Sequence, residues 1–210
     1  MLFYKQRKEV ADILRFYYRN WQRSKDSKVS KKGFWDEAQE SAYYFDQPLA
    51  SELASIFKGS SVADFGCGAG AYVNYFISQQ IEAFGCDGNP HTEELSGGSC
   101  KVIDLTEDFD LNKKFDWVLS LEVGEHIPRK YQKTYLNNLD KHADKGIILS
   151  WAIPRQLGIG HVNLRTNKYV KNIFSNLVYK NNQELEEKLR ELSTLEWCKN
   201  TIMVFERSSK

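Results

Sequence analysis

The segment that most constrains this chain is a glycine-rich turn, Asp64-Phe65-Gly66-Cys67-Gly68-Ala69-Gly70, between an expected strand and an expected helix. The apolar run at 61–66 is typical of a buried strand, and residues 71–80 are expected to be helical. Glycine has no Cβ, so Gly66 and Gly68 permit a tight turn and a close approach of the backbone to a ligand. The order strand, turn, helix therefore predicts a ligand site at the end of this strand.

The chain after Gly59 continues as short apolar runs that alternate with helical stretches. We expect strands at 81–87, 100–105, 115–121 and 146–153, helices at 129–142, 167–177 and 183–192, and a closing hairpin from residues 195–200 and 201–207. Alternation of strands and helices predicts an α/β fold: a Rossmann-like, doubly wound sheet, mostly parallel, with helices on both faces. Counting the hairpin, seven strands are expected.

Residues 1–58 are expected to form a helical cap on this core, which spans 59–210, within a single domain of 210 residues. Residues 5–24 have an apolar stripe at the helical period, and 24–33 is a polar, basic linker. A second helical stretch is expected from Phe34, and Pro48 marks a break in it or the start of a new helix. Within it, Trp35, Gln39 and Tyr43 have i, i+4, i+8 spacing, and they could line a pocket or belong to the core.

Composition excludes several classes of protein. The chain is 41% hydrophobic and 27% charged, which is typical of a globular protein, and no run of eighteen apolar residues would span a membrane. Its first residues are too charged for a secretory signal. The four cysteines have neither CxxC pairing nor the spacing of zinc ligands, so we expect buried, reduced thiols and a cytoplasmic location; they are Cys67, Cys86, Cys100 and Cys198.

Charge is distributed unevenly along the chain, although the net charge is only +1. Residues 1–32 contain ten Lys and Arg against three acidic residues. Such asymmetry can indicate an anionic partner such as a nucleic acid. We favour a solvated helical face as its explanation and keep nucleic acid as the alternative.

Two carboxylates follow the glycine turn at strand ends. Asp87 ends the next expected strand, about twenty residues on, where a carboxylate can accept both hydroxyls of a ribose. Asp104 ends the third strand, where it could accept a hydrogen bond from an adenine amino group. The two positions predict a nucleoside across the strand ends.

These motifs, VADFGCGAG, FGCDGNP and VIDL, resemble the cofactor half of class I S-adenosylmethionine-dependent methyltransferases over roughly residues 59–206. The resemblance implies that S-adenosylmethionine binds and leaves as S-adenosylhomocysteine. It places the methionine end of the donor near the turn, the ribose near Asp87 and the adenine near Asp104. The donor-binding residues it implies are Asp64, Gly66, Cys67, Gly68, Gly70, Asp87, Gly88, Asn89, Asp104, Leu105 and Leu121.

A nicotinamide dinucleotide is the main competing ligand for this turn. Its spacing does not exclude one, because Ala71 stands where the third small residue of G-x-G-x-x-G/A is needed. However, Asp64 opens the turn, and a carboxylate there would repel a pyrophosphate and suit an ammonium group. We therefore expect the phosphate-free methyl donor.

The acceptor is expected at the end of the fourth strand, Ser120-Leu121-Glu122-Val123-Gly124-Glu125-His126-Ile127-Pro128. Methyl transfer is an in-line displacement, so positioning supplies much of the catalysis and a base serves only acceptors that lose a proton. Glu122, Glu125 and His126 are candidates for that base. A loop rich in glycine and proline after the fifth strand brings His161 and Asn163 toward the same sheet edge. We take His126, Glu122 and His161 as the catalytic candidates.

Glu122, Glu125, His126 and His161 also resemble an E-x-x-E-H…H set that binds a divalent metal in small-RNA 3′-terminal ribose methyltransferases. A similar run occurs in ubiquinone-pathway O-methyltransferases. Mg²⁺ or Mn²⁺ would suit such ligands. We favour a site without metal, because Glu-His pairs recur in metal-free relatives and because the long RNA-binding additions are absent.

We therefore expect a methyltransferase (EC 2.1.1) that acts on an O or N atom of a small molecule. The fourth strand is followed neither by an Asn-Pro-Pro-Tyr run nor by a Pro-Cys nucleophile, which disfavours two kinds of DNA-base methylation. One alternative is a metal-assisted 2′-O-methyltransferase of RNA or nucleotide ribose. Another is a non-catalytic protein that binds the donor and stabilises a partner protein.

Overall fold

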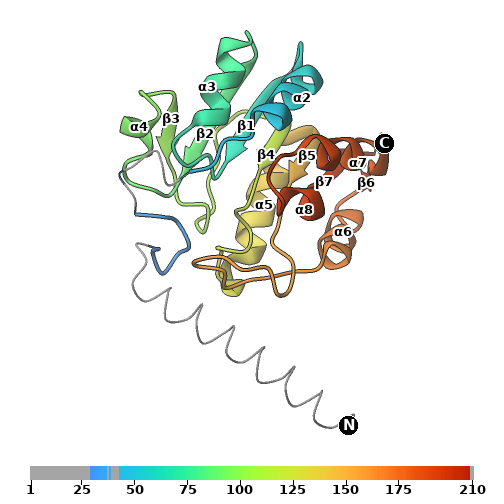
Figure 1. The fold of residues 1–210 in the computed structure, drawn as a ribbon. Coiled ribbons are helices and arrows are strands. Elements are labelled where there is room, and N and C mark those ends of the chain that lie inside the picture. Colours follow the sequence, from blue (N-terminus) through green and yellow to red (C-terminus); the bar gives the residue numbers. More distant parts are fainter. Residues whose placement is uncertain (1–28, 37, 39–42, 209–210) are drawn as a thin grey trace.

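The structure is a computed structural model that describes residues 29–36, 38 and 43–208 of the chain. Seven strands form one sheet in the order β3-β2-β1-β4-β5-β7-β6 (Figure 1). The strands are β1 (Ser61–Phe65), β2 (Glu82–Asp87), β3 (Cys100–Val102), β4 (Phe115–Ser120), β5 (Ala143–Leu149), β6 (Tyr179–Asn181) and β7 (Met203–Arg207). β1 to β5 pair in parallel, and β7 runs antiparallel to both of its neighbours. The predicted Rossmann-like sheet with an antiparallel C-terminal pair is confirmed.

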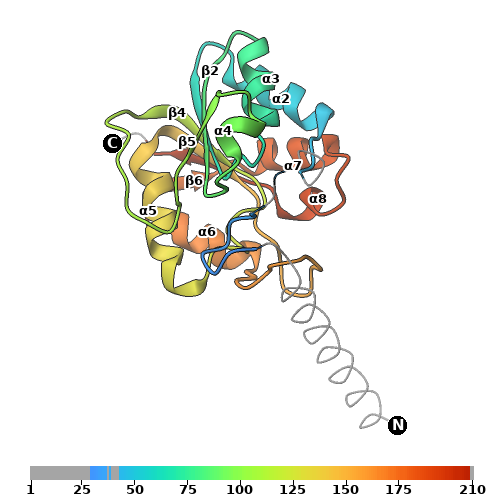
Figure 2. The same ribbon diagram turned by 90° about the vertical axis from the view of Figure 1, so that its left-hand side faces the viewer.

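Helices cover both faces of the sheet, as the two ribbon views show (Figures 1 and 2). They are α2 (Gln47–Phe57), α3 (Ala71–Ser78), α4 (Thr92–Leu95), η2 (Arg129–Tyr131), α5 (Gln132–His142), α6 (Asn167–Ser175), α7 (Gln183–Leu192) and α8 (Cys198–Thr201). Helices α2, α3, α7 and α8 share one buried cluster with the sheet, and α5 and α6 share the other.

Side-chain alternation along the strands builds these two cores. In β5, Ile147 and Leu149 point into the cluster of α5 and α6, whereas Ile148 between them points into the opposite cluster. All three are fully buried, as expected for a parallel strand with a helical layer on each face. The sheet is therefore the rigid frame on which the loops at its strand ends are held.

The strand order reverses between β1 and β4, which are direct neighbours although β2 and β3 intervene in the chain. Such a reversal leaves a crevice outside the carboxyl ends of the two strands, because the connecting segments diverge to either side. Both the glycine turn after β1 and the Glu122–His126 segment after β4 open onto this crevice.

The segment before the core differs from the expected helix that starts at Phe34. Val29 and Trp35 form an isolated antiparallel bridge around a turn closed by Gly33 N–H donating to Ser30 O (3.0 Å). Gly33 has φ +102°, which a helix does not allow. Helix α2 begins only at Gln47, where the Asp46 side chain caps it. The helix expected at 5–24 lies outside the described residues.

The closing antiparallel pair is built differently from the expected hairpin. Residues 195–200 do not form a strand: Cys198–Thr201 is the short helix α8. The partner of β7 is β6, a strand of three residues that the sequence did not mark. The strands at 100–105 and 146–153 also end early, at Val102 and Leu149, so Asp104 follows β3 rather than ending it.

Among the described residues, no helix is long and apolar enough to cross a lipid bilayer. All four cysteines are free thiols. Cys86, Cys100 and Cys198 are buried, and Cys67 is half-buried in the glycine turn.

Candidate active site

The glycine turn joins β1 to α3 in a conformation that needs glycine. Gly66 and Gly68 have φ of +91° and +55°, and Gly70 has +78° where it caps the start of α3. The N–H of Gly66 donates to Cys86 O (2.7 Å), which fixes the turn against the end of β2. A Cβ on Gly66 would overlap the Val123 side chain, so this backbone also contacts the loop after β4.

Asp87 organises the turn from the end of β2. Its Oδ2 accepts the Gly68 N–H (2.9 Å) and its Oδ1 accepts the Asn89 N–H (2.8 Å). The Asn89 side chain donates to Tyr43 Oη (2.6 Å). Burial raises the pKa of Asp87, against the opposing effect of these backbone hydrogen bonds. A carboxylate has about four lone-pair sites, so each oxygen retains room for one more donor.

Asp64 lies beside the turn and is buried. Burial raises the pKa of its carboxyl well above the usual range, and the charges of Cys100 and Asp87 act in the same direction. A cationic group of a ligand would favour the ionised form of this carboxyl, because an opposite charge offsets the cost of burying a negative one.

Asp104 is already engaged on both oxygens. Its Oδ1 accepts from the Thr106 N–H (2.9 Å) and hydroxyl (2.6 Å), and Lys32 Nζ lies 2.7 Å from Oδ2. The same ammonium lies 2.6 Å from Glu107 Oε1. Burial raises the pKa of Asp104, but the hydrogen bonds from Lys32 and Thr106 outweigh it, so the pKa is lowered.

Residues 29–36 lie across the cleft as a strap. Phe34 packs on Gly88, where a Cβ would overlap the Phe34 ring. The next residue, Trp35, meets the His126 ring edge to face, with centroids 5.9 Å apart. Lys32 makes the ion pairs with Asp104 and Glu107, both in the segment after β3. The strap thus contacts both the β2–β3 side and the β4 side of the crevice.

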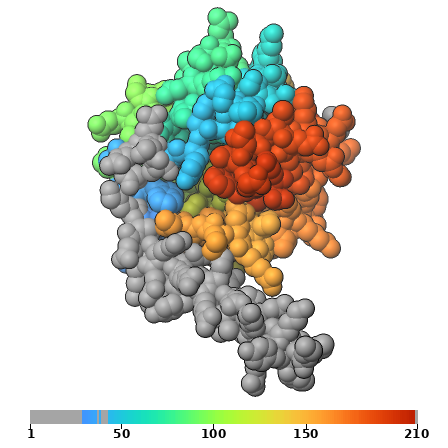
Figure 3. Space-filling view, viewed as in Figure 1, coloured from blue at the N-terminus to red at the C-terminus, as the bar shows by residue number. Residues whose placement is uncertain are grey.

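These parts enclose a cleft of about 590 Å³. In the space-filling view its mouth lies between the blue segment before α2, the orange loop after β5 and the red α7–α8 region (Figure 3). Nine of the predicted donor-side residues line it: Asp64, Gly66, Cys67, Gly68, Asp87, Gly88, Asp104, Leu105 and Leu121. Gly70 and Asn89 do not line it and support the turn from behind.

Glu122 is held in a fixed orientation at the end of β4. Its backbone has φ +56°, which is uncommon for a residue other than glycine, and its N–H donates to Ser150 Oγ (2.7 Å). Gln156 Nε2 donates to its Oε2 (3.1 Å). The Thr201 hydroxyl, which lies 2.7 Å from the Trp197 carbonyl oxygen, is 3.3 Å from Glu122 Oε1. Burial raises the pKa of this carboxyl. It lines the cleft, as predicted.

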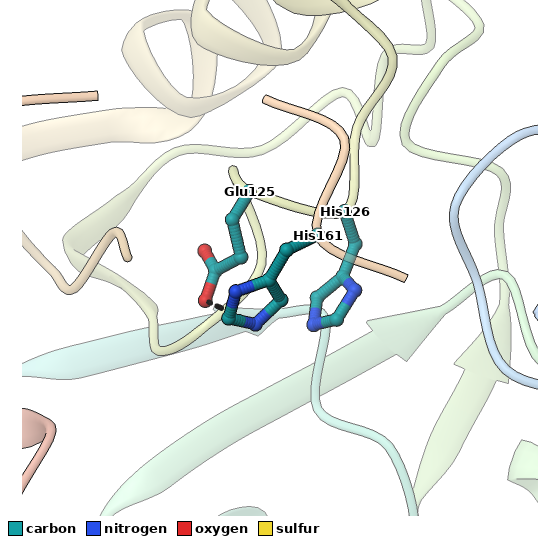
Figure 4. Close-up of side chains that lie close together, drawn as sticks. All are labelled: Glu125, His126 and His161. Carbon is teal, nitrogen blue, oxygen red and sulfur yellow. Dashed lines mark ion pairs between the residues drawn. The ribbon is translucent and has the colours of Figure 1, made fainter. Parts of the chain in front are cut away.

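Three further side chains meet beside Glu122, as the close-up shows (Figure 4). Glu125 Oε1 lies 4.0 Å from His161 Nε2, and the rings of His161 and His126 are 5.1 Å apart between centroids. Both histidines line the cleft. Burial, then the charge of His161, lowers the pKa of His126 to about 3, and burial lowers that of His161. Burial, then the charge of Glu122, raises the pKa of Glu125 well above its usual range.

No protein-family model matches this chain. A stretch of 145 residues, 65% of the chain, is 28% identical to cyclopropane-fatty-acyl-phospholipid synthase of Escherichia coli K12. The match spans only 38% of that enzyme's length. It therefore relates this chain to one part of the larger enzyme.

Solved structures resemble the whole core. Magnesium protoporphyrin IX methyltransferase from Synechocystis PCC 6803, with bound SAM, has a TM-score of 0.56 at 18% identity, over 76% of this chain and 78% of that one. The sugar N-methyltransferase from Streptoalloteichus sp. has a TM-score of 0.61 at 12% identity, over 78% and 88%. The fold is that of the class I S-adenosylmethionine-dependent methyltransferases.

In this methyltransferase fold, the structure brings nine of the eleven predicted donor-side residues and the three catalytic candidates Glu122, His126 and His161 into one cleft. Trp35 and Tyr43 both line the cleft, although neither lies in a helix. Gln39, the third residue of that predicted stripe, is outside the described residues. Asn163 does not reach the cleft: it is buried, its side chain donates to Gln132 Oε1 (3.2 Å), and its carbonyl accepts from Trp151 Nε1 (2.6 Å).

Sequence reasoning missed three polar residues of this methyltransferase fold: Lys32, Gln156 and Thr201. Lys32 holds Asp104, and the other two hold Glu122. Each comes from a segment at least 34 residues away from its partner in the chain. Gln156 lies in the loop already marked as a wall of the site, but nothing in the sequence distinguished Lys32 or Thr201 from surface residues.

Proposed function

We propose that this chain transfers a methyl group from S-adenosylmethionine to an oxygen or nitrogen atom of a small-molecule acceptor. One observation carries the proposal: a single cleft at the strand-order reversal holds the glycine turn, Asp87 and Asp104 together with the polar end of β4. Its volume is in the range of sites that hold a nucleoside and a small acceptor.

On the donor side, the free lone pairs of Asp87 would accept the two ribose hydroxyls. Asp64 would face the cationic methionine end, where an ammonium group keeps the buried carboxyl ionised. The adenine would lie near Leu105 and Asp104. Since Lys32 and Thr106 already occupy the Asp104 oxygens, an adenine amino group would share that carboxylate with them.

On the acceptor side, Leu121 and Glu122 lie at the end of β4, beside the expected position of the methyl group. Glu122, His126 and His161 would hold the acceptor in line with the sulfonium and manage its proton where one is lost. The strap would exclude water from the reacting atoms. Each of these roles belongs to a side chain that lines the cleft.

The range of acceptors is inferred from structural neighbours. Their names specify magnesium protoporphyrin IX, 1,6-didemethyltoxoflavin and a sugar nitrogen as acceptors. These small molecules differ widely, so they support the class of acceptor and not its identity. We do not extend the proposal to nucleic acids, because the basic segment 1–32 falls largely outside the described residues.

Calorimetry with S-adenosylhomocysteine tests the donor site. We expect one equivalent to bind, and the Asp87→Ala variant to bind at least tenfold more weakly, because it loses charge-assisted hydrogen bonds worth about 1.5–3 kcal/mol each. Asp144→Ala, which removes an exposed carboxylate of β5, is the matched control and should bind normally. Binding of a nicotinamide dinucleotide in place of S-adenosylhomocysteine would overturn the proposal.

Turnover is then tested with S-adenosylmethionine labelled in its methyl group and a library of small hydroxyl and amine acceptors. Transfer of label to one acceptor class supports the enzyme. Donor binding without transfer to any member of a broad library would instead favour a protein that binds the donor and does not catalyse.

A further inference from the structure

Glu125, His126 and His161 form a cluster of metal-ligand atoms beside the cleft. One ligand atom from each lies within 4.8 Å of the other two. Glu125 and His126 are adjacent on the turn after β4, and His161 comes from the loop after β5. Figure 4 shows the Glu125 carboxylate directed toward the His161 ring, with the His126 ring beside it.

Several polar atoms of this cluster are buried with few partners. Glu125 has no exposed surface, and its carboxyl has the neighbouring Glu122 carboxyl and the Ala152 backbone N–H near it, without an Asn, Gln, Lys or Arg donor among the described residues. The buried Nδ1 of His161 likewise has no side-chain partner there. Buried polar atoms are nearly always hydrogen-bonded, and leaving a charged one without a partner is costly. Two neighbouring buried carboxyls beside two imidazoles are a place where a bound cation would favour the ionised form, because an opposite charge offsets the cost of burial and the repulsion between the carboxylates.

We propose that Glu125, His126 and His161 bind a divalent transition-metal ion. Both histidines line the cleft whereas Glu125 does not, so the ion would be held from the protein side with a coordination position open to the cleft. An oxygen atom of the acceptor would take that position. This last role rests on the proposed methyl transfer; the ion site itself does not.

The types of ligand select the class of ion. Two imidazole nitrogens and one carboxylate suit Zn²⁺ and its neighbours, whereas Mg²⁺ prefers oxygen ligands throughout. Ligand atoms around a tetrahedral zinc ion are about 3.3 Å apart, so the three groups must close by up to about 1.5 Å from their present spacing. Rotation of side chains can supply a movement of this size.

The surrounding contacts orient the ligands. His126 Nδ1 lies 3.3 Å from the Gly160 carbonyl oxygen, and a histidine that donates from Nδ1 keeps its lone pair on Nε2 for a metal. The Glu125 carbonyl oxygen accepts the N–H groups of Val162 and Asn163, both at 2.9 Å. These bonds fasten the loop of His161 to the turn of Glu125 and His126, so the three ligands are held in one place.

Glu122 is not part of this ligand set. Its Oε2 accepts from the Gln156 amide (3.1 Å), a side-chain donor that Glu125 lacks, and its Oε1 lies 3.3 Å from the Thr201 hydroxyl. The structure therefore assigns three ligands with two imidazoles, and not a set of two carboxylates and two histidines.

Titration of the metal-free full chain with Zn²⁺ alone, followed by calorimetry, tests the site. We expect one Zn²⁺ per chain, and binding at least tenfold weaker in each of Glu125→Gln, His126→Ala and His161→Ala. Saturating Zn²⁺ should raise the Tm of the wild type and not that of the variants. His91→Ala removes a partly exposed histidine outside the cluster and is the control that should bind as the wild type does.

Glu125→Gln keeps the shape of the side chain and removes the buried charge, so the metal-free variant should fold with an unchanged or higher Tm. Zinc that binds equally to the wild type and to all three variants, or that fails to bind at all, overturns the site. S-adenosylhomocysteine is titrated into the same samples. If S-adenosylhomocysteine binds and Zn²⁺ does not, the proposed metal site is wrong and the proposed methyl transfer is unaffected. If Zn²⁺ binds and S-adenosylhomocysteine does not, the metal site stands but the ion has no role in methyl transfer.

Discussion

At the scale of single residues, Gly66 and Gly98 form a matched pair. Their φ values are +91° and +88°, but a Cβ on Gly66 would overlap Val123 in the cleft, whereas a Cβ on Gly98 would meet nothing within 4 Å. Alanine at either position introduces similar backbone strain, which should lower the free energy of unfolding by about 1–2 kcal/mol. Only Gly66→Ala should also weaken binding of S-adenosylhomocysteine, by tenfold or more, because it displaces the turn or Val123.

Denaturant unfolding and calorimetry of the two variants measure both effects. Equal loss of donor affinity in Gly66→Ala and Gly98→Ala would mean that backbone strain alone, and not contact in the cleft, accounts for the effect. Normal donor affinity in Gly66→Ala would place the donor away from the glycine turn.

The sequence could predict residues whose position depends on local structure. The glycine turn and Asp87 sit at fixed offsets from strand ends, and the cleft contains both. Side chains that act through distant segments could not be predicted. Lys32 reaches Asp104 across 72 residues and Thr201 reaches Glu122 across 79, and no local pattern encodes either contact. The catalytic roles of Glu122, His126 and His161 stay predictions.

At the scale of elements, the strap of residues 29–36 is held at its centre by an exposed ion pair. Lys32→Met keeps the aliphatic stem and removes the charge that reaches Asp104 and Glu107. We expect S-adenosylhomocysteine to dissociate several-fold faster from this variant at low salt, because the strap opens more readily. The difference should shrink as salt is raised, since salt screens exposed charges.

Stopped-flow measurement of dissociation at two salt concentrations provides the comparison. Lys31→Met, which removes the exposed neighbouring charge, is the control and should release the ligand like the wild type. If Lys32→Met and the wild type release it at the same rate in low salt, the ion pair does not hold the strap closed.

Element type followed from the sequence wherever periodicity was strong. Helix α7 runs from Gln183 to Leu192, which is the predicted range, and the five parallel strands were all expected. Short edge elements were not predictable. β6 has three residues and exists because it pairs with β7, while the apolar Leu195 and Trp197 alternate as in a strand but precede helix α8. Tertiary pairing, not local preference, decides such segments.

At the scale of the whole molecule, Asp46 joins the start of the described core to its C-terminal part. Its Oδ1 caps α2 through the Leu49 N–H (3.4 Å). Its Oδ2 accepts from the Ser193 hydroxyl (2.6 Å) and the Thr194 N–H (2.8 Å), beyond the end of α7. These bonds span almost 150 residues and hold α2 against α7 in the layer that covers one face of the sheet.

Acid should weaken this connection selectively. Burial raises the pKa of Asp46, but the hydrogen bonds from Ser193, Thr194 and Leu49 outweigh burial, so its pKa is lowered in the folded state. A lowered folded pKa adds stability that is present above the unfolded pKa, about 3.9, and is lost as pH falls through the folded value. We expect Asp46→Asn to lower the free energy of unfolding by about 1–3 kcal/mol at pH 7. Because asparagine still caps α2, this loss measures the contacts of the charged carboxylate with residues 193–195.

Urea unfolding of the wild type and Asp46→Asn at pH 7 and near pH 3 checks this prediction. The difference between them should narrow at the lower pH, because the wild-type carboxyl approaches the neutral state that asparagine imitates. Asp144→Asn, at an exposed position near the start of β5, should show no difference from the wild type at either pH. A gap between the wild type and Asp46→Asn that stays constant with pH would mean that shape, and not the charge of Asp46, joins the two ends of the fold.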